Sequence, residues 1–452
     1  MRLTYILPTS TSTRKEMPMR LGDLVIDVTP LRASRDFRFL FAARLVSVLG
    51  LGLTLVALPL QVWQLTRSSW QVGLIGVVNM VPMLVGTLAG GVLADRMDRR
   101  RLILLARGGA VVVFAALALN AMVDTPYLWV IYVCAAVNSI LNGLSVTALM
   151  AATPALVGRA HLSAAGALMA LTAQLGAIIG PSVAGGLTEL AGLPWNYGLT
   201  AAATLVTTCL IAFIRPLPRT GGRPHESPLQ SIAGGLRFVA GNRLIAGLLL
   251  IDVCVAVFAM PFVIFPELTE RVYGDGGTIL GLFYAAPGVG AMVAALTSGW
   301  TGTVRHTGRY LAIATAGCGV AVAGLGLTSA HLWPALFFLA ALGAADTTSE
   351  ILRRSLLQHH TPDHLQGRIS SLWLAQTNIS PAVGGIEVGL AARVAGPATA
   401  LVAGGVLCVV GSLAVAGTFR DLRDASLRDP NAEQVRAGRP APAGDGQSSS
   451  GA

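Results

Sequence analysis

Twelve apolar stretches, each close to the length of a membrane-spanning helix, follow one another along the 452-residue chain. Six fall at residues 38–63, 71–94, 102–122, 127–151, 163–187 and 196–214, and six more at 244–267, 277–300, 309–328, 331–355, 369–393 and 397–418. A bilayer crossing takes ~20 apolar residues, so twelve need about 240, and an apolar content of 54% supplies them. Because these residues form continuous runs rather than the alternation of a membrane barrel, the sequence predicts an all-α polytopic membrane protein with twelve transmembrane helices.

The two sets of six stretches predict two six-helix halves. We expect a cytoplasmic arm (1–37), a first half (38–214), a linker with an amphipathic helix (215–243), a second half (244–419) and a disordered tail (420–452). An offset of 208 residues carries Gly73 onto Gly281 and Thr153-Pro154 onto Thr361-Pro362, which indicates duplication. Paired halves are typical of transporters, whose substrate site lies between them near the bilayer midplane.

Basic residues fall on one side of the predicted membrane. The arm, the linker, the tail and alternate loops hold 27 Lys and Arg, whereas the other side holds three, Arg67, Arg271 and Arg393. Cytoplasmic loops collect Lys and Arg, so both termini and the linker are predicted to be cytoplasmic. Topology thus accounts for the net charge of +10, and no pattern for binding nucleic acid accompanies it.

Several functions are excluded or disfavoured by what the chain lacks. Its five cysteines are scattered singly, without metal-ligand or disulfide spacing, and its single lysine is Lys15, outside any phosphate-binding loop. We therefore expect no metal, no cofactor, no ATP-driven pumping and no enzyme activity. The expected partners are the lipid bilayer, a small-molecule substrate and protons, and a monomer is the default for this architecture.

The loop between the second and third stretches reads Gly-Val-Leu-Ala-Asp-Arg-Met-Asp-Arg-Arg-Arg from Gly91 to Arg101. It resembles the loop signature of the major facilitator superfamily, with Asp98 where glycine is usual, and we expect Asp98 to take the left-handed conformation that Asp tolerates. Asp95 is expected to face the positive N-terminus of span eleven near Arg368. The pattern predicts a cytoplasmic gate, and simple anchoring by positive charge is the alternative. The residues assigned to this gating loop are Gly91, Asp95, Arg96, Asp98, Arg99 and Arg100.

A second pattern lies in span five, where Gly176, Gly180, Pro181 and Gly185 bring small residues and a proline together. It resembles the helix motif of exporters in the same superfamily, which favours export over uptake. Small residues let helices approach closely, and span eight is the expected partner. Packing without a specific function is the alternative.

Polar residues inside the spans are candidates for transport chemistry, because charges in a bilayer are costly and usually functional. In the superfamily that the chain resembles, spans one, four, seven and ten line the cavity. Asp346 is the first candidate for proton coupling, followed by Glu350 and Asp252; Glu350 pairing with Arg353 or Arg354 as a structural bridge is the alternative. The substrate-cavity candidates are Arg44, Gln61, Asn138, Asn142 and Gln174.

A closer resemblance links residues 38–420 to siderophore exporters of this superfamily. It is carried by stretches such as Phe41–Ser47, Trp70–Leu74, Trp195–Leu199 and Gly281–Ala286. The resemblance implies proton-driven export of a catecholate siderophore across the cytoplasmic (inner) membrane. Multidrug or macrolide efflux is the main alternative, and a non-transporting sensor or an uptake carrier are minor ones.

Overall fold

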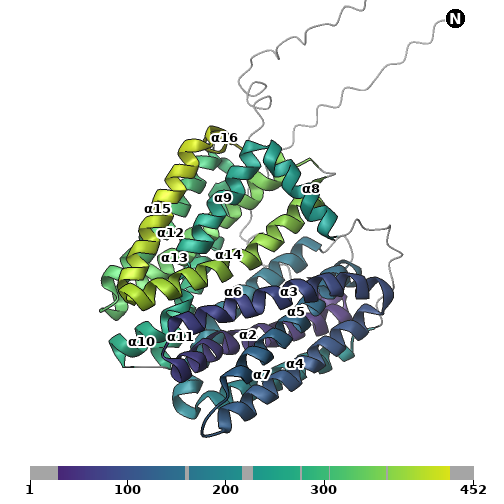
Figure 1. The fold of residues 1–452 in the computed structure, drawn as a ribbon. Helices are drawn as coiled ribbons and strands as arrows, with labels where there is room; N and C mark the ends of the chain where they lie inside the picture. The colour runs from purple at the N-terminus through teal and green to yellow at the C-terminus, as the bar shows by residue number, and fades with distance from the viewer. Residues whose placement is uncertain are drawn as a thin grey trace, which may run out of the picture.

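The computed structural model describes residues 29–157, 162–215, 228–274, 277–304, 306–362 and 365–427, and its regular elements are helices (Figure 1). The predicted arm up to residue 28, linker residues 216–227 and the tail from residue 428 lie outside this description. The first half comprises α1 (Thr29–Ala33), α2 (Arg35–Thr66), α3 (Ser69–Arg96), α4 (Arg99–Met122), α5 (Leu128–Val157), α6 (Leu162–Ala191) and α7 (Leu193–Ala212).

The amphipathic helix α8 (Pro228–Gly241) leads into the second half. That half comprises α9 (Arg243–Phe258), η3 (Pro261–Val263), α10 (Phe265–Tyr273), α11 (Thr278–Leu296), η4 (Ser298–Thr303), α12 (Thr307–Thr328), α13 (Leu332–His360), α14 (Gln366–Ala395), α15 (Pro397–Thr418) and α16 (Arg420–Asp424). Within the described ranges, ten helices are long and apolar enough to cross a membrane, and α7 and α14 pack among them. The predicted all-α membrane fold is confirmed.

Local sequence explains where the helices begin and end. The Ser34 hydroxyl accepts a hydrogen bond from the Phe37 N–H at 3.2 Å, and the Asn242 carboxamide accepts one from the Ile245 N–H at 3.1 Å, so both residues cap helices. Gly192 (φ +85°) and Gly396 (φ +84°) form the one-residue turns after α6 and α14. Positive φ values suit glycine, and the matching turns support the predicted duplication of the halves.

The predicted seventh span is not one continuous helix, which corrects the stretch proposed at 244–267. Helix α9 ends at Phe258, and the chain passes through η3 before α10 begins. Pro261 has no N–H to continue the helical hydrogen bonds, which explains the break after Met260. The part of this span beyond Met260 therefore belongs to a separate short helix.

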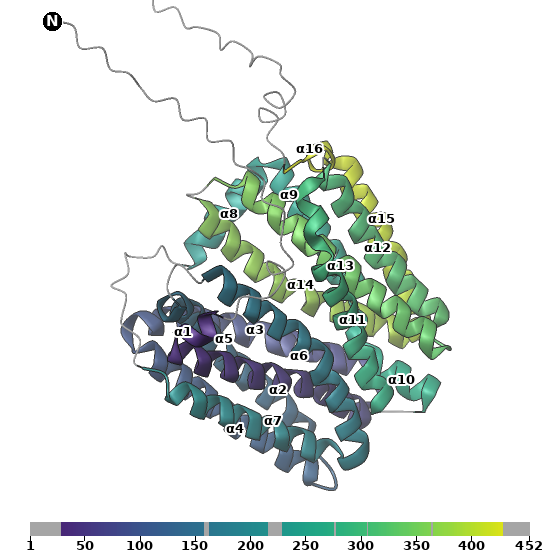
Figure 2. The same cartoon turned by 180° about the vertical axis from the view of Figure 1, so that it is seen from behind.

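The two halves meet at one end and diverge toward the other (Figures 1 and 2). We call the closed end, where α10 lies, the α10 end, and the opposite end the α8 end. At the α10 end α3 packs on α14, and a Cβ placed on Gly73 would lie 2.5 Å from the Gly385 carbonyl oxygen. Helix α6 packs equally closely on α11, where a Cβ on Gly281 would lie 2.6 Å from the Pro181 carbonyl oxygen. Small residues thus bring the backbones of the two halves into contact.

Candidate substrate cavity and gates

A cavity of about 710 Å³ lies between the halves at mid-height. Its wall is formed by the middle of α2, α3, α5 and α6 on one side, and by α14, Tyr284 of α11 and the break around Phe262 on the other. The Tyr284 hydroxyl donates to the Phe262 carbonyl at 2.8 Å, and the two rings stack with centroids 6.0 Å apart. Because close packing shuts the α10 end, the route into this cavity lies at the α8 end.

Among the residues that the structure describes, the cavity wall carries no charged side chain. Its polar groups are mainly four carboxamides, those of Asn79, Asn138, Asn142 and Asn378, set among aliphatic and aromatic side chains. The Ser139 hydroxyl donates to Asn79 Oδ1 at 2.9 Å and fixes that carboxamide. Such a wall can pack against rings and exchange hydrogen bonds with hydroxyl and carbonyl groups.

The structure places Asn138 and Asn142 on this wall, but not the other three substrate-cavity candidates. Gln61 is 2% exposed inside the first half, where its Oε1 accepts a hydrogen bond from the Tyr197 hydroxyl at 2.8 Å. Arg44 and Gln174 also lie away from the wall. Asn79 and Asn378 were missed because they lie on spans two and eleven, which the sequence reasoning did not assign to the cavity.

None of the three proton-coupling candidates lines the described cavity wall, which corrects the expectation that Asp252 on span seven and Asp346 and Glu350 on span ten face the cavity. Helix α13 packs on α11 and α12 instead. Asp252 forms an ion pair with Arg353 of α13 and accepts a hydrogen bond from Gln376 of α14 at 2.8 Å. These contacts tie three helices of the second half together.

The other two acids, both on α13, differ in their partners. Glu350 forms an ion pair with Arg354 at 2.7 Å, and the Arg354 guanidinium lies 4.3 Å from the centre of the Trp373 ring. This is the geometry of the structural bridge considered for Glu350. Asp346 makes no hydrogen bond or ion pair with any described residue, although the charges of Asp252, Glu350 and Arg353 lie near it.

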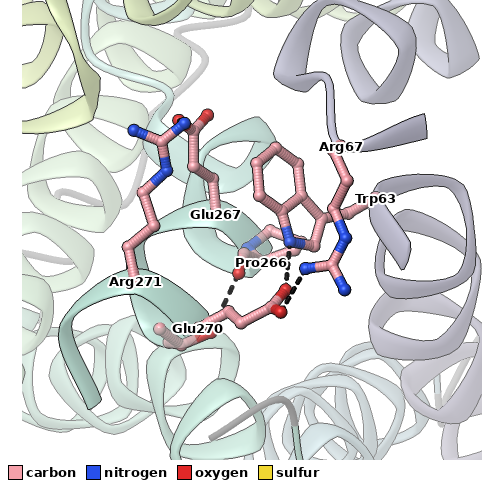
Figure 3. Close-up of polar contacts among 7 residues, drawn as sticks. Trp63, Arg67, Pro266, Glu267, Glu270 and Arg271 are labelled. Atoms are coloured by element: carbon pink, nitrogen blue, oxygen red, sulfur yellow. Dashed lines mark hydrogen bonds and ion pairs between the residues drawn. The ribbon is translucent and has the colours of Figure 1, made fainter. Parts of the chain in front are cut away.

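Polar contacts join the halves at the α10 end, and sequence reasoning missed them (Figure 3). Glu270 of α10 forms an ion pair with Arg67 and accepts a hydrogen bond from the Trp63 indole N–H. Glu267, which is 3% exposed, accepts a hydrogen bond from the Ser69 hydroxyl. We call these contacts among Trp63, Arg67, Ser69, Glu267 and Glu270 the α10 latch.

The surroundings of the latch favour the charged form of Glu270. The hydrogen bond from Arg67 lowers the pKa of the Glu270 carboxyl below its ordinary value; partial burial acts in the opposite direction, and the Trp63 hydrogen bond adds to the lowering. Arg271 pairs with Glu267 at 2.9 Å, one turn along α10. A second contact across the halves joins Glu189 of α6 to the Thr278 N–H of α11 at 3.2 Å.

The predicted gating loop is only partly described, because the side chains of Asp95 and Arg96 lie outside the described part. Asp98 has φ −61° rather than the expected left-handed value, and its carboxylate accepts a hydrogen bond from the Arg100 N–H at 2.8 Å. Asp98 therefore caps α4. Arg100 donates to the Ala212 carbonyl at the end of α7, and no described atom lies within 4 Å of a Cβ placed on Gly91.

The glycine–proline motif of α6 lies where two helices approach it. A Cβ on Gly176 would overlap the Val48 side chain of α2, and a Cβ on Gly180 would lie 2.8 Å from the Gly52 Cα. Gly185 faces α11, where its Cβ would lie 2.7 Å from the Gly281 Cα. The motif thus packs α6 against its own half and against the opposite half at once.

A fold of two six-helix halves around a central cavity defines a class of membrane transporters. The Major Facilitator Superfamily model matches residues 40–385, and the chain belongs to this superfamily. It is a multi-pass membrane transporter rather than an enzyme.

Within the superfamily, the chain is similar to a group of exporters. It is 38% identical over 390 residues to the enterobactin exporter EntS of Citrobacter koseri. The matched region covers 86% of this chain and 93% of that protein. EntS proteins of Shigella boydii and Escherichia coli are 37% identical with the same coverage. The resemblance seen in the sequence is confirmed.

Solved structures support the fold alone. The nucleoside transporter NupG matches with a TM-score of 0.69 at 11% identity, over 85% of this chain and 99% of that one. A POT family transporter in complex with 5-aminolevulinic acid matches with a TM-score of 0.68 at 10% identity, over 86% and 97% of the two chains.

Proposed function

We propose that this protein is a secondary active exporter that moves a catecholate siderophore out of the cytoplasm. The observation that carries the proposal is the similarity to enterobactin exporters along 86% of the chain, through both halves. The proposed transport unit is a monomer in the cytoplasmic (inner) membrane, with protons as the coupling ion.

The cavity supports a substrate of this chemistry. Catechol rings pack well on the apolar and aromatic wall, and the four carboxamides of Asn79, Asn138, Asn142 and Asn378 supply donors and acceptors for ring hydroxyls and carbonyls. Its volume of about 710 Å³ is in the usual range for small-molecule sites. The described part of this wall is uncharged, which favours a molecule whose bulk is neutral.

The charge asymmetry of the loops supports an orientation with the α8 end in the cytoplasm. In this orientation the cavity is accessible from inside, and the α10 latch closes the outside. The substrate enters between the diverging halves, the halves rock about the cavity, and the latch opens to release the substrate outward. In the outward-open state the gating loop at Asp95, Arg96, Arg99 and Arg100 closes the inner face.

Proton coupling is assigned to Asp346. Charges inside a membrane are costly, and Asp346 has no hydrogen bond or ion pair to a described residue, whereas Asp252 and Glu350 are paired with Arg353 and Arg354. An acid without a fixed cation is suited to take up a proton in one part of the cycle and to release it in another. Asp252 and Glu350 then help to set the charge around it.

The first test is siderophore distribution with and without the gene under iron limitation. We expect less siderophore in the medium and more in the cells of the deletion strain, and restoration by the wild-type gene. Unchanged secretion would contradict the proposal.

The largely apolar, uncharged wall also suits drug-like molecules, so multidrug or macrolide efflux is the second candidate. A deletion strain that secretes siderophore normally but becomes sensitive to several drugs would establish it.

The Asp95→Asn variant separates transport from a non-transporting role of the protein. The variant should lose substrate flux while the amount of protein in the membrane stays equal to that of the wild type.

A further inference from the structure

Two arginines in the first half have no acidic partner among the described residues. Arg107 of α4 donates to the Ser47 hydroxyl at 3.3 Å, and Arg44 of α2 makes no hydrogen bond or ion pair with a described residue. They are close enough for their like charges to act on each other. In the second half, by contrast, the buried Arg353 is neutralised by Asp252.

A small cavity of about 30 Å³ adjoins Arg107. Ser145 lines it and is 1% exposed, yet its hydroxyl has no hydrogen-bond partner among the described residues. A buried polar group without a partner costs free energy, and the space is enough for about two water molecules or one group of carboxylate size.

The small cavity lies directly behind the wall of the large one. Leu51, Asn138 and Asn142 line both cavities, so these side chains separate them. A group carried by a molecule in the large cavity therefore needs to pass only this wall to reach Arg107. The described wall of the large cavity is uncharged, and the positive charge lies behind its carboxamides.

We propose that Arg107, with Ser145 and the adjacent charge of Arg44, binds one oxyanion group, a carboxylate or a catecholate, of the molecule held in the large cavity. This deepens the proposed function and rests on it for the identity of that molecule. Arginine pairs with planar oxyanions through two hydrogen bonds, and a bound anion offsets the repulsion between Arg44 and Arg107. The phosphate of an anionic lipid is the other source of the same chemistry.

The test compares two small probes on the purified full-length protein in detergent. 2,3-Dihydroxybenzoate and catechol share a ring and two hydroxyls, but only the first carries a carboxylate. Isothermal titration of wild type should show tighter binding of 2,3-dihydroxybenzoate. Arg107→Gln should weaken that binding at least tenfold and change catechol binding less than twofold. Arg107→Lys should keep part of the preference for 2,3-dihydroxybenzoate. The control is Arg393→Gln, at the exposed end of α14, which should change the binding of neither probe.

Equal binding of 2,3-dihydroxybenzoate by wild type and Arg107→Gln would overturn the proposal, as would an equal loss for catechol. If Arg107→Gln does not fold, Ser145→Ala provides a second test. The preference for 2,3-dihydroxybenzoate over catechol should also fall in Ser145→Ala. Phosphatidylglycerol is then added to wild type. Loss of 2,3-dihydroxybenzoate binding assigns the oxyanion site to lipid phosphate, and retention assigns it to the cavity ligand. The two proposals can fail separately. If the deletion strain secretes siderophore normally but carboxylate binding still depends on Arg107, the siderophore function is wrong and the oxyanion site at Arg107 stands.

Discussion

Arg67, at the end of α2, forms an ion pair with Glu270 of α10, and the two residues belong to opposite halves of the transporter. The pair lies at the end where α3 meets α14 and α6 meets α11. Closure of this end therefore combines close backbone packing with polar contacts that water can replace.

Glu270→Gln should shift the molecule toward opening at the α10 end. Exposed ion pairs contribute ~0.2–1 kcal/mol, so the ratio of closed to open forms should fall by up to about fivefold. Spin labels on Val123 and Val394, two exposed positions in different halves, would report the distance after removal of native cysteines. Arg309→Gln, which breaks the pair with Asp424 inside the second half, should leave the distance unchanged. The same result for both variants would remove the latch from the gating mechanism.

The latch should not respond to pH near neutrality. Because its contacts lower the pKa of Glu270, their stabilisation is complete above the ordinary Glu value of about 4.3. It is lost as the pH falls through the lowered value. The label distance should stay constant from pH 8 to pH 6 and lengthen only under strong acid. An opening between pH 8 and pH 6 that Glu270→Gln abolishes would contradict this prediction.

Two adjacent glycines of α6 offer a matched pair of substitutions. A Cβ on Gly185 would lie 2.6 Å from the Gly277 carbonyl oxygen, whereas no described atom lies within 4 Å of a Cβ on Gly186. Overpacking costs ~1–3 kcal/mol, so Gly185→Ala should reduce the closed population at the α10 end by about tenfold. Gly186→Ala should leave it unchanged. Equal label distances in the two variants would contradict the prediction, because the close contact between α6 and α11 would then not stabilise the closed form.

Asp252→Asn should strongly destabilise the second half. Breaking a buried ion pair on one side costs ~3–5 kcal/mol, and Arg353, which is 5% exposed, would lose its anion. Thermal unfolding in detergent should show a large loss for Asp252→Asn and partial recovery when Arg353→Gln is added. Glu350→Gln, next to the half-exposed Arg354, should cost under about 1 kcal/mol. No recovery in the double variant would mean that Asp252 acts through something other than Arg353.

Asp346→Asn should separate proton-driven transport from downhill transport. In vesicles with an imposed proton gradient, accumulation against the substrate gradient should disappear, while flux down the substrate gradient continues. Glu350→Gln should retain most of the driven transport, because Glu350 already has a fixed partner in Arg354. Normal driven transport by Asp346→Asn would remove Asp346 from the coupling mechanism.

The helices were predictable because hydropathy is read along the chain, one segment at a time. The length of each apolar run sets a span, and Pro and Gly mark the linker. The break near Pro261 has a visible signal, because Met260-Pro261 interrupts an apolar run whose length alone predicts one continuous helix. The cavity wall was harder to predict, since apolar membrane helices carry little contrast between their faces.

Contacts between distant residues limited the prediction of the site. Gln61 is polar within a span, which suggested the cavity, but its partner Tyr197 lies 136 residues away in the same half. The latch acids follow Pro266 in a short polar run. Their position opposite Arg67 depends on how the halves meet, which no local pattern encodes.

The two faces of α10 have a thermodynamic consequence. Phe265 lies in an apolar cluster that the second half shares with Leu60 of α2. Glu267 and Glu270, on the same short helix, make the polar contacts across the halves. Opening the α10 end therefore exposes hydrocarbon, including the buried Trp63 indole ring, together with carboxylates and a guanidinium. Heat capacity rises mainly with newly exposed apolar surface, so the open form should have the higher heat capacity. The preference for the closed form should accordingly follow a curve with temperature, weakening on cooling as well as on heating.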